Sequence, residues 1–415
     1  MNVRAGRFPL FDSLRAIAAL AVVTTHAAFY SGALNSHIAL LRQVAARLDV
    51  GVTIFFFISA FLLYRPFARA ALRDEPSPEV LPYAWRRVLR IVPAYWLALT
   101  VTAALLGQKG IFTPSGIVIH YGFGQIYRTD TLATGLGQAW TLCIEVTFYA
   151  FLPLWALALS KLRWRSPAAR LRGELWALGA LAAASMAFKI VVLAAQPAGP
   201  MRATWSLWTL PAYLDQFAVG MAIALLSVWW EKRDELPRLV RPIDRFPGIA
   251  WLFALVSLLV VSAGLGLHGH FPEAFSKVQF IEMHVLYAAV GLGVILPAVF
   301  GNQGRGVVRR VLANRVLLWL GLISYGIYLW HQMVFIKLSQ EGFNAGSFIH
   351  PYVGWLLAAL LGGILCATVS YYAMERPLMR FKRLVPGRRA RPEGEALAEP
   401  APLAPASVPA ASEGT

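Results

Sequence analysis

The sequence predicts an all-α fold, a polytopic membrane bundle of about ten transmembrane helices with no soluble catalytic domain. Of its 415 residues, 58% are apolar and only 14% are charged, and the mean hydropathy is +0.58, which is far too high for a soluble domain. Apolar windows of about 20 residues, the length that crosses a bilayer, recur along the chain. Basic residues gather in alternate connections between these windows. These three observations indicate a membrane bundle.

The apolar windows define the expected organisation of the chain. They fall near residues 14–32, 49–67, 90–107, 138–159, 174–195, 208–230, 248–268, 280–300, 316–337 and 353–374. We therefore expect one transmembrane domain over residues 1–383. The tail, residues 384–415, is rich in proline and alanine and has no apolar periodicity, which indicates a disordered cytoplasmic extension.

Charge is distributed unevenly between the two sides of the expected bundle. The connections after the second, fourth, sixth and eighth windows are basic, whereas the other connections carry few lysines or arginines. By the positive-inside rule, both termini are cytoplasmic and the protein lies in the cell's inner (plasma) membrane. This topology accounts for most of the net charge of +17 without nucleic acid as a partner. Cys143 and Cys366 lie in apolar windows, so neither a disulfide framework nor a metal site is indicated.

The first window carries a charged and a titratable side chain in an otherwise apolar helix. Arg15 and His26 are eleven residues apart, which at about 100° per residue brings them onto one helix face, roughly 16 Å apart along the axis. Polar residues in lipid are costly, and by default they face a bundle interior or a watery cavity and suggest function. The structural alternatives are an arginine that snorkels to the membrane surface and a histidine satisfied inside the bundle.

The expected orientation sorts the other polar residues by depth. With a rise of about 1.5 Å per residue, His26 and Glu145 fall at a similar depth, roughly 10 Å below the outer surface. The outer half also holds Asp215, Glu282, His284 and His331. Arginines gather at the inner end instead: Arg15, Arg65, Arg87, Arg90 and Arg376. Lipid headgroups are alternative partners for these arginines. The asymmetry suits an anion that binds from the cytoplasm and chemistry that takes place deeper in the bundle.

Six different segments lie within or beside these windows and are considered together. They are FDSLRAIAALAVVTTH (11–26), GVTIFFFISAFLL (51–63), RRVLRIVPAYW (86–96), QAWTLCIEVTFYAFLPL (138–154), SYGIYLWHQMV (324–334) and YYAMERPLMR (371–380). In this order and at these depths they resemble the motifs of acyltransferase family 3, a family of integral membrane acyl-CoA-dependent O-acyltransferases. The resemblance covers about residues 8–383. Thr53, Ala60, Val146 and Thr147 depart from the family pattern, whereas Glu145 is kept.

The resemblance implies transfer of an acyl group, typically acetyl, from cytoplasmic acyl-CoA to a hydroxyl of a carbohydrate or glycosylated acceptor, without a metal. A neutral imidazole such as His26 is suited to act as general base near neutral pH, or as nucleophile in an acyl-histidine relay. Glu145 would fix the imidazole tautomer and stabilise the imidazolium. Arginine is the natural bidentate partner of CoA phosphates, so Arg87, Arg90 and Arg15 are donor-side candidates. The candidate catalytic residues are therefore His26, Glu145 and Arg15.

The acceptor is expected to bind in the outer half. Carboxylate, imidazole and hydroxyl groups hydrogen-bond sugar hydroxyls, and aromatic rings offer flat apolar surfaces to sugar rings, although an interfacial aromatic belt is the alternative for the aromatics. The candidates are Asp215, His331, Tyr325, Trp140 and Ser324. We expect an envelope glycan, a lipid-linked sugar or a secreted glycosylated metabolite; a cytoplasmic antibiotic or macrolide is the main competing acceptor.

Two other functional classes fit parts of the pattern. Histidines and carboxylates within membrane helices also form proton relays, so a proton-coupled transporter or flippase of a polar substrate is the main alternative. A non-catalytic scaffold fits least, since it leaves the costly polar residues without a role. The arginine pair before the third window favours the acyltransferase, because a transporter has no evident need for phosphate-binding arginines on one side.

Overall fold

The computed structural model of the chain describes residues 8–35, 38–132, 134–202, 204–231, 240–269, 274–343 and 350–385. All regular secondary structure in these ranges is helical, which confirms the predicted all-α class. Residues 386–415 of the expected tail lie outside the described residues, and the domain boundary at residue 383 stays a prediction.

Seven helical segments in the described ranges are long and apolar enough to cross a membrane. They are α1 (Leu10–Tyr30), α2 (Ala39–Arg47) continued by α3 (Gly51–Arg73), α4 (Val80–Leu105), α6 (Trp140–Ser160), α7 (Pro167–Ala194), α11 (Lys277–Val299) and α15 (Pro351–Ser370) with the residues that follow it. Two apolar helices, α8 (Leu214–Trp230) and α10 (Gly248–Leu259), are shorter. Every predicted window overlaps a helix, but the count of about ten spans is not confirmed.

The ninth predicted window, near residues 316–337, forms two helices. These are α13 (Arg315–Leu322) and α14 (Ser324–Gln340). At the break between them, the Ser324 hydroxyl donates a hydrogen bond of 2.8 Å to the carbonyl of Gly321. The shorter helices are α5 (Pro114–Tyr121), α9 (Arg241–Arg245), α12 (Val307–Leu312) and α16 (Arg376–Leu378). Between α15 and α16, Tyr371–Glu375 forms a π-helical segment, a feature frequent at functional sites.

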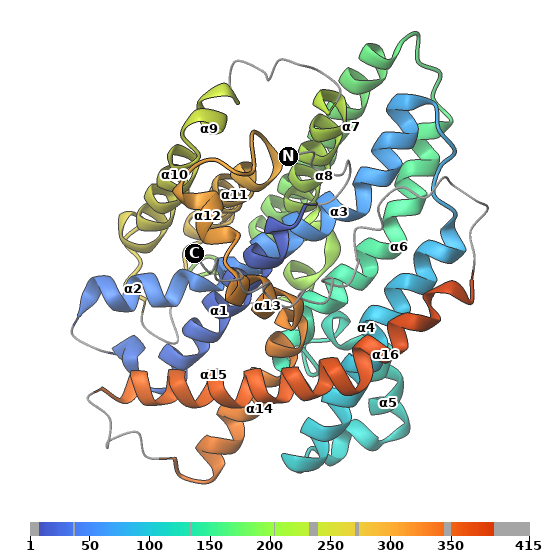
Figure 1. Cartoon of the computed structure of the whole chain (residues 1–415). Helices are drawn as coiled ribbons and strands as arrows, with labels where there is room; N and C mark the ends of the chain where they lie inside the picture. Colours follow the sequence, from blue (N-terminus) through green and yellow to red (C-terminus); the bar gives the residue numbers. More distant parts are fainter. Residues whose placement is uncertain are drawn as a thin grey trace, which may run out of the picture.

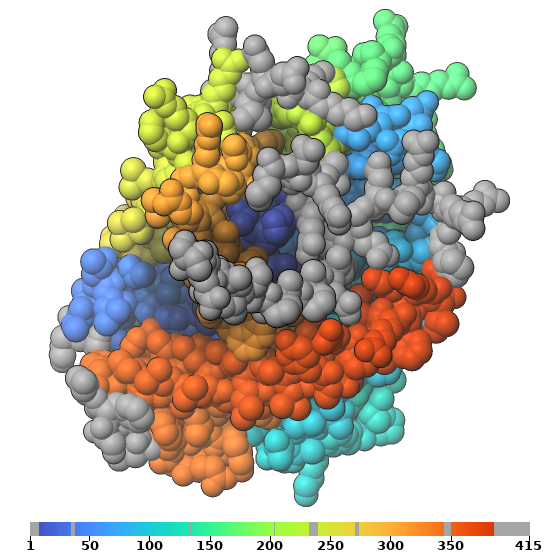
Figure 2. Space-filling view, viewed as in Figure 1, coloured from blue at the N-terminus to red at the C-terminus, as the bar shows by residue number. Residues whose placement is uncertain are grey.

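Helix α1 lies within the bundle and contacts α14, which carries the candidate residues Ser324, Tyr325 and His331. It packs against α3, α13, α14 and α15, and Figure 1 shows α15 running across the bundle close to α1 and α14. In the space-filling view, α15 and its continuation form an unbroken band over one face (Figure 2). At the start of α1, the buried Ser13 hydroxyl donates a 2.5 Å hydrogen bond to the carbonyl of Leu312. This bond links α1 to α12.

Small residues let the backbones around α1 approach closely, as is common between membrane helices. A Cβ atom added to Gly51 would lie 2.3 Å from the carbonyl oxygen of Ala18. A Cβ atom added to Gly321 would lie 1.8 Å from the carbonyl oxygen of Asp12. Both glycines therefore determine how near α3 and α13 come to α1.

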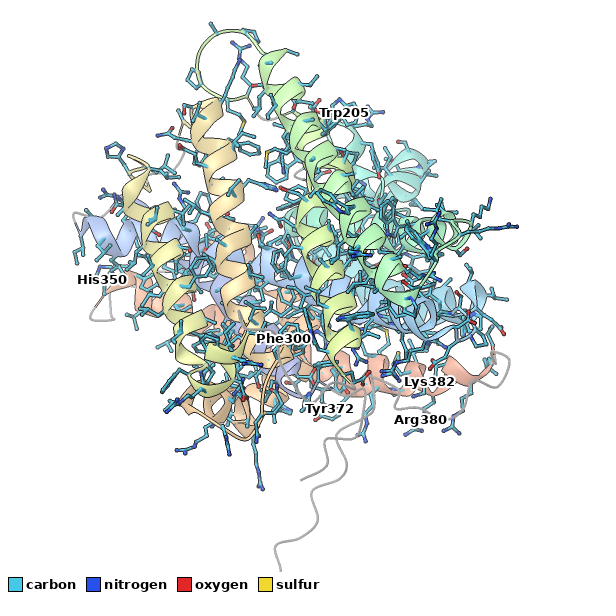
Figure 3. The ribbon with its side chains drawn as sticks, turned by 90° about the horizontal axis from the view of Figure 1, so that it is seen from above. Trp205, Phe300, His350, Tyr372, Arg380 and Lys382 are labelled. Atoms are coloured by element: carbon cyan, nitrogen blue, oxygen red, sulfur yellow. The ribbon has the colours of Figure 1, made fainter. Side chains whose placement is uncertain are left out.

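The buried apolar side chains form two main clusters. One is rich in phenylalanine and joins α3, α6 and α8 around Phe56, Phe148 and Phe217. The second joins α1, α4, α14 and α15. Away from both, Tyr372, Arg380 and Lys382 lie along one edge of the molecule, and Trp205 lies at the opposite edge (Figure 3). Of the polar groups described next, those around Arg15 and His26 come mainly from α1, α4, α6 and α14, and those around Asp215 come from α7, α8 and α11.

Candidate active site

The structure places Arg15 and His26 on α1 as the spacing predicts. Both residues are partly buried between neighbouring helices, and the Arg15 side chain is 16% exposed. Since eleven helical residues cover roughly 16 Å, the two groups belong to different levels of the bundle. Each level gathers its own set of partners.

The level of His26 is formed by α1 and α14. The Nε2 atom of His331 lies 3.2 Å from Nδ1 of His26, and the ring centroids are 5.0 Å apart. The side-chain amide nitrogen of Gln332 lies 3.0 Å from Nε2 of His26. His331 is fully buried, whereas His26 and Gln332 are partly exposed. The structure thus brings His331, expected in the same outer half, into direct contact with His26.

The level of Arg15 holds an arginine cluster, which we define as Arg15, Arg87 and Arg90. Arg15 forms an ion pair with Asp12, with 3.0 Å between the guanidinium nitrogen and the carboxylate oxygen. The first half of α4 supplies Arg87 and Arg90, and the three guanidinium groups interact electrostatically. The Nε atom of Arg87 is buried and has no hydrogen-bond partner among the described residues. A buried donor without a partner is costly, so this atom is suited to an anionic ligand.

Glu145 belongs to the arginine cluster and not to the histidine level. It interacts electrostatically with all three arginines, and its carboxylate accepts a 2.5 Å hydrogen bond from the Tyr149 hydroxyl. No hydrogen bond joins it to His26 within the described residues. The contacts of Glu145 therefore do not include the expected hydrogen bond that would orient the His26 imidazole. Depth along the axis suggested that contact, but the rotation of α6 about its own axis decides which groups the carboxylate faces.

A second carboxylate beside the arginine cluster comes from the π-helical segment. Glu375 is buried and interacts electrostatically with Arg90, and the Ser370 hydroxyl donates to it at 3.3 Å. Glu375 is not among the residues expected at the site, because it follows the last apolar window, where a carboxylate is ordinarily at the surface.

Asp215 lies in a separate polar cluster formed by α7, α8 and α11. The ammonium of the fully buried Lys189 is 2.7 Å from its carboxylate, and Nε2 of His284 is 3.2 Å away. The hydroxyl of Ser185 donates to the same carboxylate at 3.2 Å. Lys189 is not among the residues expected at the site, although a single lysine in a long apolar helix is a signal of a buried ion pair.

The other candidate acceptor residues have distinct surroundings. Trp140 packs edge-on against Trp208 at 4.6 Å between centroids and lies 5.6 Å from the Tyr213 ring, which in turn contacts His284. The hydroxyl of Tyr325 donates to the carbonyl of Ile91 at 2.9 Å, beside the arginine cluster. Trp140 and Asp215 therefore share one neighbourhood, whereas Tyr325 lies near the arginines. The Ser324 hydroxyl is hydrogen-bonded within the break between α13 and α14.

Metal-binding groups are not gathered anywhere in the described ranges: no three His, Cys, Asp or Glu side chains there are arranged to hold a metal ion. Cys143 and Cys366 are both free thiols. The side chains at the levels of Arg15 and His26 carry guanidinium, carboxylate and imidazole groups.

Comparison with known proteins identifies the family. The family model of the acyltransferase domain, acyltransferase family 3, matches residues 9–375. Exopolysaccharide production protein ExoZ of Rhizobium meliloti (strain 1021) is 26% identical over 80% of this chain and 89% of its own length. Acyltransferase MdmB of Streptomyces mycarofaciens is 25% identical over 92% of this chain and 94% of its own.

A longer relative matches along part of its length. Peptidoglycan O-acetyltransferase OatA of Listeria monocytogenes serovar 1/2a (strain ATCC BAA-679 / EGD-e) is 25% identical over 90% of this chain, which spans 56% of that protein. No solved structure shows a significant match. Because the family model covers nearly the whole transmembrane bundle, the chain belongs to acyltransferase family 3 and is a multi-pass membrane acyltransferase.

Proposed function

We propose that this enzyme transfers an acyl group, acetyl in the simplest case, from acyl-CoA to a hydroxyl of a glycan or glycosylated acceptor. The observation that carries the proposal is the polar face of α1, which leads from the arginine cluster at Arg15 to the imidazole of His26. An acyl-CoA has phosphates at one end and a thioester at the other. Two levels separated by roughly 16 Å along one helix match a ligand of that form.

The arginine cluster is the proposed donor site. The unpartnered Nε of Arg87 and the neighbouring Arg90 and Arg15 supply guanidinium donors, which bind phosphate oxygens in pairs. Glu145, held by Tyr149, balances part of this positive charge while the donor is absent. We therefore assign Glu145 to positioning the arginines that bind acyl-CoA.

His26 is the proposed reacting group, as base or as relay nucleophile. As a base, its Nε2 takes the proton of the acceptor hydroxyl while the hydroxyl oxygen attacks the thioester carbonyl carbon. The carbon–sulfur bond then breaks, and the imidazolium returns the proton to the thiolate of CoA. As a nucleophile, Nε2 itself attacks the thioester carbonyl carbon and the carbon–sulfur bond breaks, which gives an acyl-imidazolium and the thiolate of CoA. The acceptor hydroxyl oxygen then attacks the acyl carbon, the bond to Nε2 breaks, and the hydroxyl proton passes to the thiolate.

The proposed acceptor surface is formed by the neighbourhood of Trp140 and Asp215. The Trp140 ring contacts both the Trp208 ring and the Tyr213 ring, and Tyr213 packs against His284, which pairs with the carboxylate of Asp215. Aromatic rings beside hydrogen-bonding groups are suited to sugar rings. The names of ExoZ and OatA refer to exopolysaccharide and peptidoglycan, which supports a glycan acceptor.

The basic connections support an orientation with both termini cytoplasmic in the inner membrane, so acyl-CoA would enter from the cytoplasm. We propose that the acceptor enters from the opposite face. Membership of an acyltransferase family favours this enzyme over the transporter that the sequence left open.

The test uses the purified protein in sealed, oriented vesicles. Acetyl-CoA is supplied at the cytoplasmic face, and a membrane-impermeant glycan is supplied at the other. Transfer across the membrane is expected, and His26→Ala should lower the rate by about 10²- to 10⁴-fold, the usual contribution of a positioned base. His350→Ala, on the helix cap of α15, is the matched control and should leave transfer unchanged. Normal turnover by a folded His26→Ala protein would refute the proposed chemistry.

A second comparison assigns the donor site. Arg87→Ala should raise the KM for acetyl-CoA. Added salt should also raise this KM in the wild-type protein, because salt screens charge-assisted contacts. Its neighbour Arg86→Ala is the matched control and should have a smaller effect. An unchanged KM for acetyl-CoA with a raised KM for the glycan would move the arginines to the acceptor site. Transfer only when both substrates share the cytoplasmic face would overturn the proposed direction and leave the transferase intact.

A further inference from the structure

The imidazole of His26 is hydrogen-bonded at both nitrogens. Nδ1 lies 3.0 Å from the carbonyl oxygen of Val22 and 3.2 Å from Nε2 of His331. Nε2 lies 3.0 Å from the amide nitrogen of Gln332. In turn, Nδ1 of His331 lies 3.1 Å from the carbonyl oxygen of Ile327. These contacts form one chain from the backbone of α14 through both rings to Gln332.

Two backbone carbonyl oxygens assign the protons in this chain. A carbonyl oxygen only accepts, so Nδ1 of His331 carries its proton toward Ile327 and its Nε2 keeps a lone pair. By the same reasoning, Nδ1 of His26 carries a proton, shared between the Val22 carbonyl and the lone pair of His331. The Nε2 atom of His26 is left as the basic nitrogen, and it accepts from Gln332.

We propose that His331 and Gln332 are the positioning residues of His26, a proposal that rests on the proposed function. Together with the Val22 carbonyl, His331 holds the ring in the tautomer whose Nε2 is basic, and the Gln332 amide occupies the position that the acceptor hydroxyl takes when it binds. When Nε2 gains a proton, the positive charge is stabilised through the hydrogen bond from Nδ1 to His331. A neutral imidazole thus has the role that a buried carboxylate has in a Ser-His-Asp triad.

The surroundings explain why an imidazole suits this role here. His331 is fully buried, and no carboxylate forms a hydrogen bond with either ring in the described ranges. An unpaired carboxylate at such a position is expensive to bury, whereas a neutral ring with both nitrogens hydrogen-bonded is not. The aromatic rings of Tyr328 and Phe335 flank His331, which leaves it little freedom to turn.

A second set of bonds holds this part of α14 against the 3-10 turn Gly137–Ala139, which precedes α6. The buried Gln138 amide donates to the carbonyls of Tyr328 and Leu329 at 3.2 and 2.8 Å. The Tyr328 hydroxyl donates back to the carbonyl of Gln138 at 2.7 Å. A Cβ atom added to Gly137 would lie 3.3 Å from the Gln332 side-chain oxygen, so that oxygen faces the turn before α6. The amide nitrogen is thereby directed toward His26.

The test of His331 compares two substitutions. His331→Leu removes the side-chain acceptor of Nδ1–H and leaves only the Val22 carbonyl, whereas His331→Gln replaces the lost acceptor with a side-chain carbonyl. We expect His331→Leu to lower kcat by about 10²-fold, within the contribution of the base itself, with the KM for acetyl-CoA unchanged. His331→Gln should recover most of that loss. Equal losses in the two variants, in proportion to a fall in thermal stability, would mean a purely structural role and would overturn the proposal.

The test of Gln332 measures which molecule takes the acyl group. In Gln332→Leu, Nε2 of His26 is open to water, whose oxygen attacks the thioester carbonyl while Nε2 takes a proton; the carbon–sulfur bond breaks, and acetate and CoA are released. We expect the ratio of acetyl-CoA hydrolysis to glycan transfer to rise several-fold. Gln340→Leu, at the exposed end of α14, is the matched control. An unchanged ratio in a folded Gln332→Leu protein would overturn the role of Gln332.

These outcomes are separate from those of the proposed function. If His26→Ala is inactive while His331→Leu and Gln332→Leu behave as wild type, the transferase chemistry stands and the positioning residues are wrong. If His26→Ala is fully active, the proposed reaction fails first.

Discussion

Replacing Gly321 with alanine tests how closely α13 must approach the start of α1. The added Cβ would lie 1.8 Å from the carbonyl oxygen of Asp12 and 2.3 Å from its carbon, whereas real Cβ contacts are essentially never under 3.0 Å. Both clashing atoms belong to the backbone, so no side chain can rotate away. The two helices must therefore separate by about 1 Å, which places Arg15, one turn further along α1, out of register with Arg87 and Arg90.

We expect Gly321→Ala to lower the free energy of unfolding by about 1–3 kcal/mol, the usual cost of overpacking, and to lower kcat/KM for acetyl-CoA by about 10²-fold, as a misplacement of about 1 Å can do. Thermal unfolding in detergent and acyl transfer measure the two effects. Gly179→Ala on α7 is the matched control, because its added Cβ has no atom within 4 Å and alanine favours helix. Wild-type stability and activity in Gly321→Ala would refute the importance of this close approach.

Three further predictions concern topology, a buried ion pair and acid stability. In a protein without its native cysteines, Ser115→Cys and Arg165→Cys should react with an impermeant thiol reagent from opposite sides of sealed vesicles; labelling from one side would contradict the arrangement. Lys189→Met should lower the free energy of unfolding by about 3–5 kcal/mol because Asp215 keeps a buried charge, and the double variant with Asp215→Leu should recover much of the loss, as chemical unfolding would measure. Glu231 follows the last residue of α8. Burial opposes its ionisation, but three arginines of α3 outweigh burial and hold the pKa of Glu231 below its ordinary value of 4.5. The stabilisation from this ion pairing is therefore present above pH 4.5 and is lost as the pH falls through the lowered pKa. Glu231→Gln should be less stable at neutral pH and change less in acid, and identical acid profiles would argue against this pairing.

The class of the protein and the polar face of α1 follow from the sequence alone. Apolar composition and window length determine that the chain lies in a membrane. Because backbone groups in lipid must be hydrogen-bonded within helices or closed barrels, the apolar windows are expected to be helical. The spacing of Arg15 and His26 determines that they share a face, since the helix repeat is fixed. The proximity of Arg87 and Arg90 also follows from the sequence, because the two residues are less than one helical turn apart on α4. Each of these inferences needs only the geometry of one helix.

The partners of these residues were decided by the tertiary structure. Depth along a helix axis follows from residue counting, but the direction of a side chain also depends on how each helix is rotated and tilted against its neighbours. That rotation turns Glu145 toward the arginines and brings His331 to His26. It also pairs Asp215 with Lys189. The number of spans depended on tertiary structure for a related reason: a break such as that at Ile323 is set by packing and local hydrogen bonds, which an apolar window does not reveal.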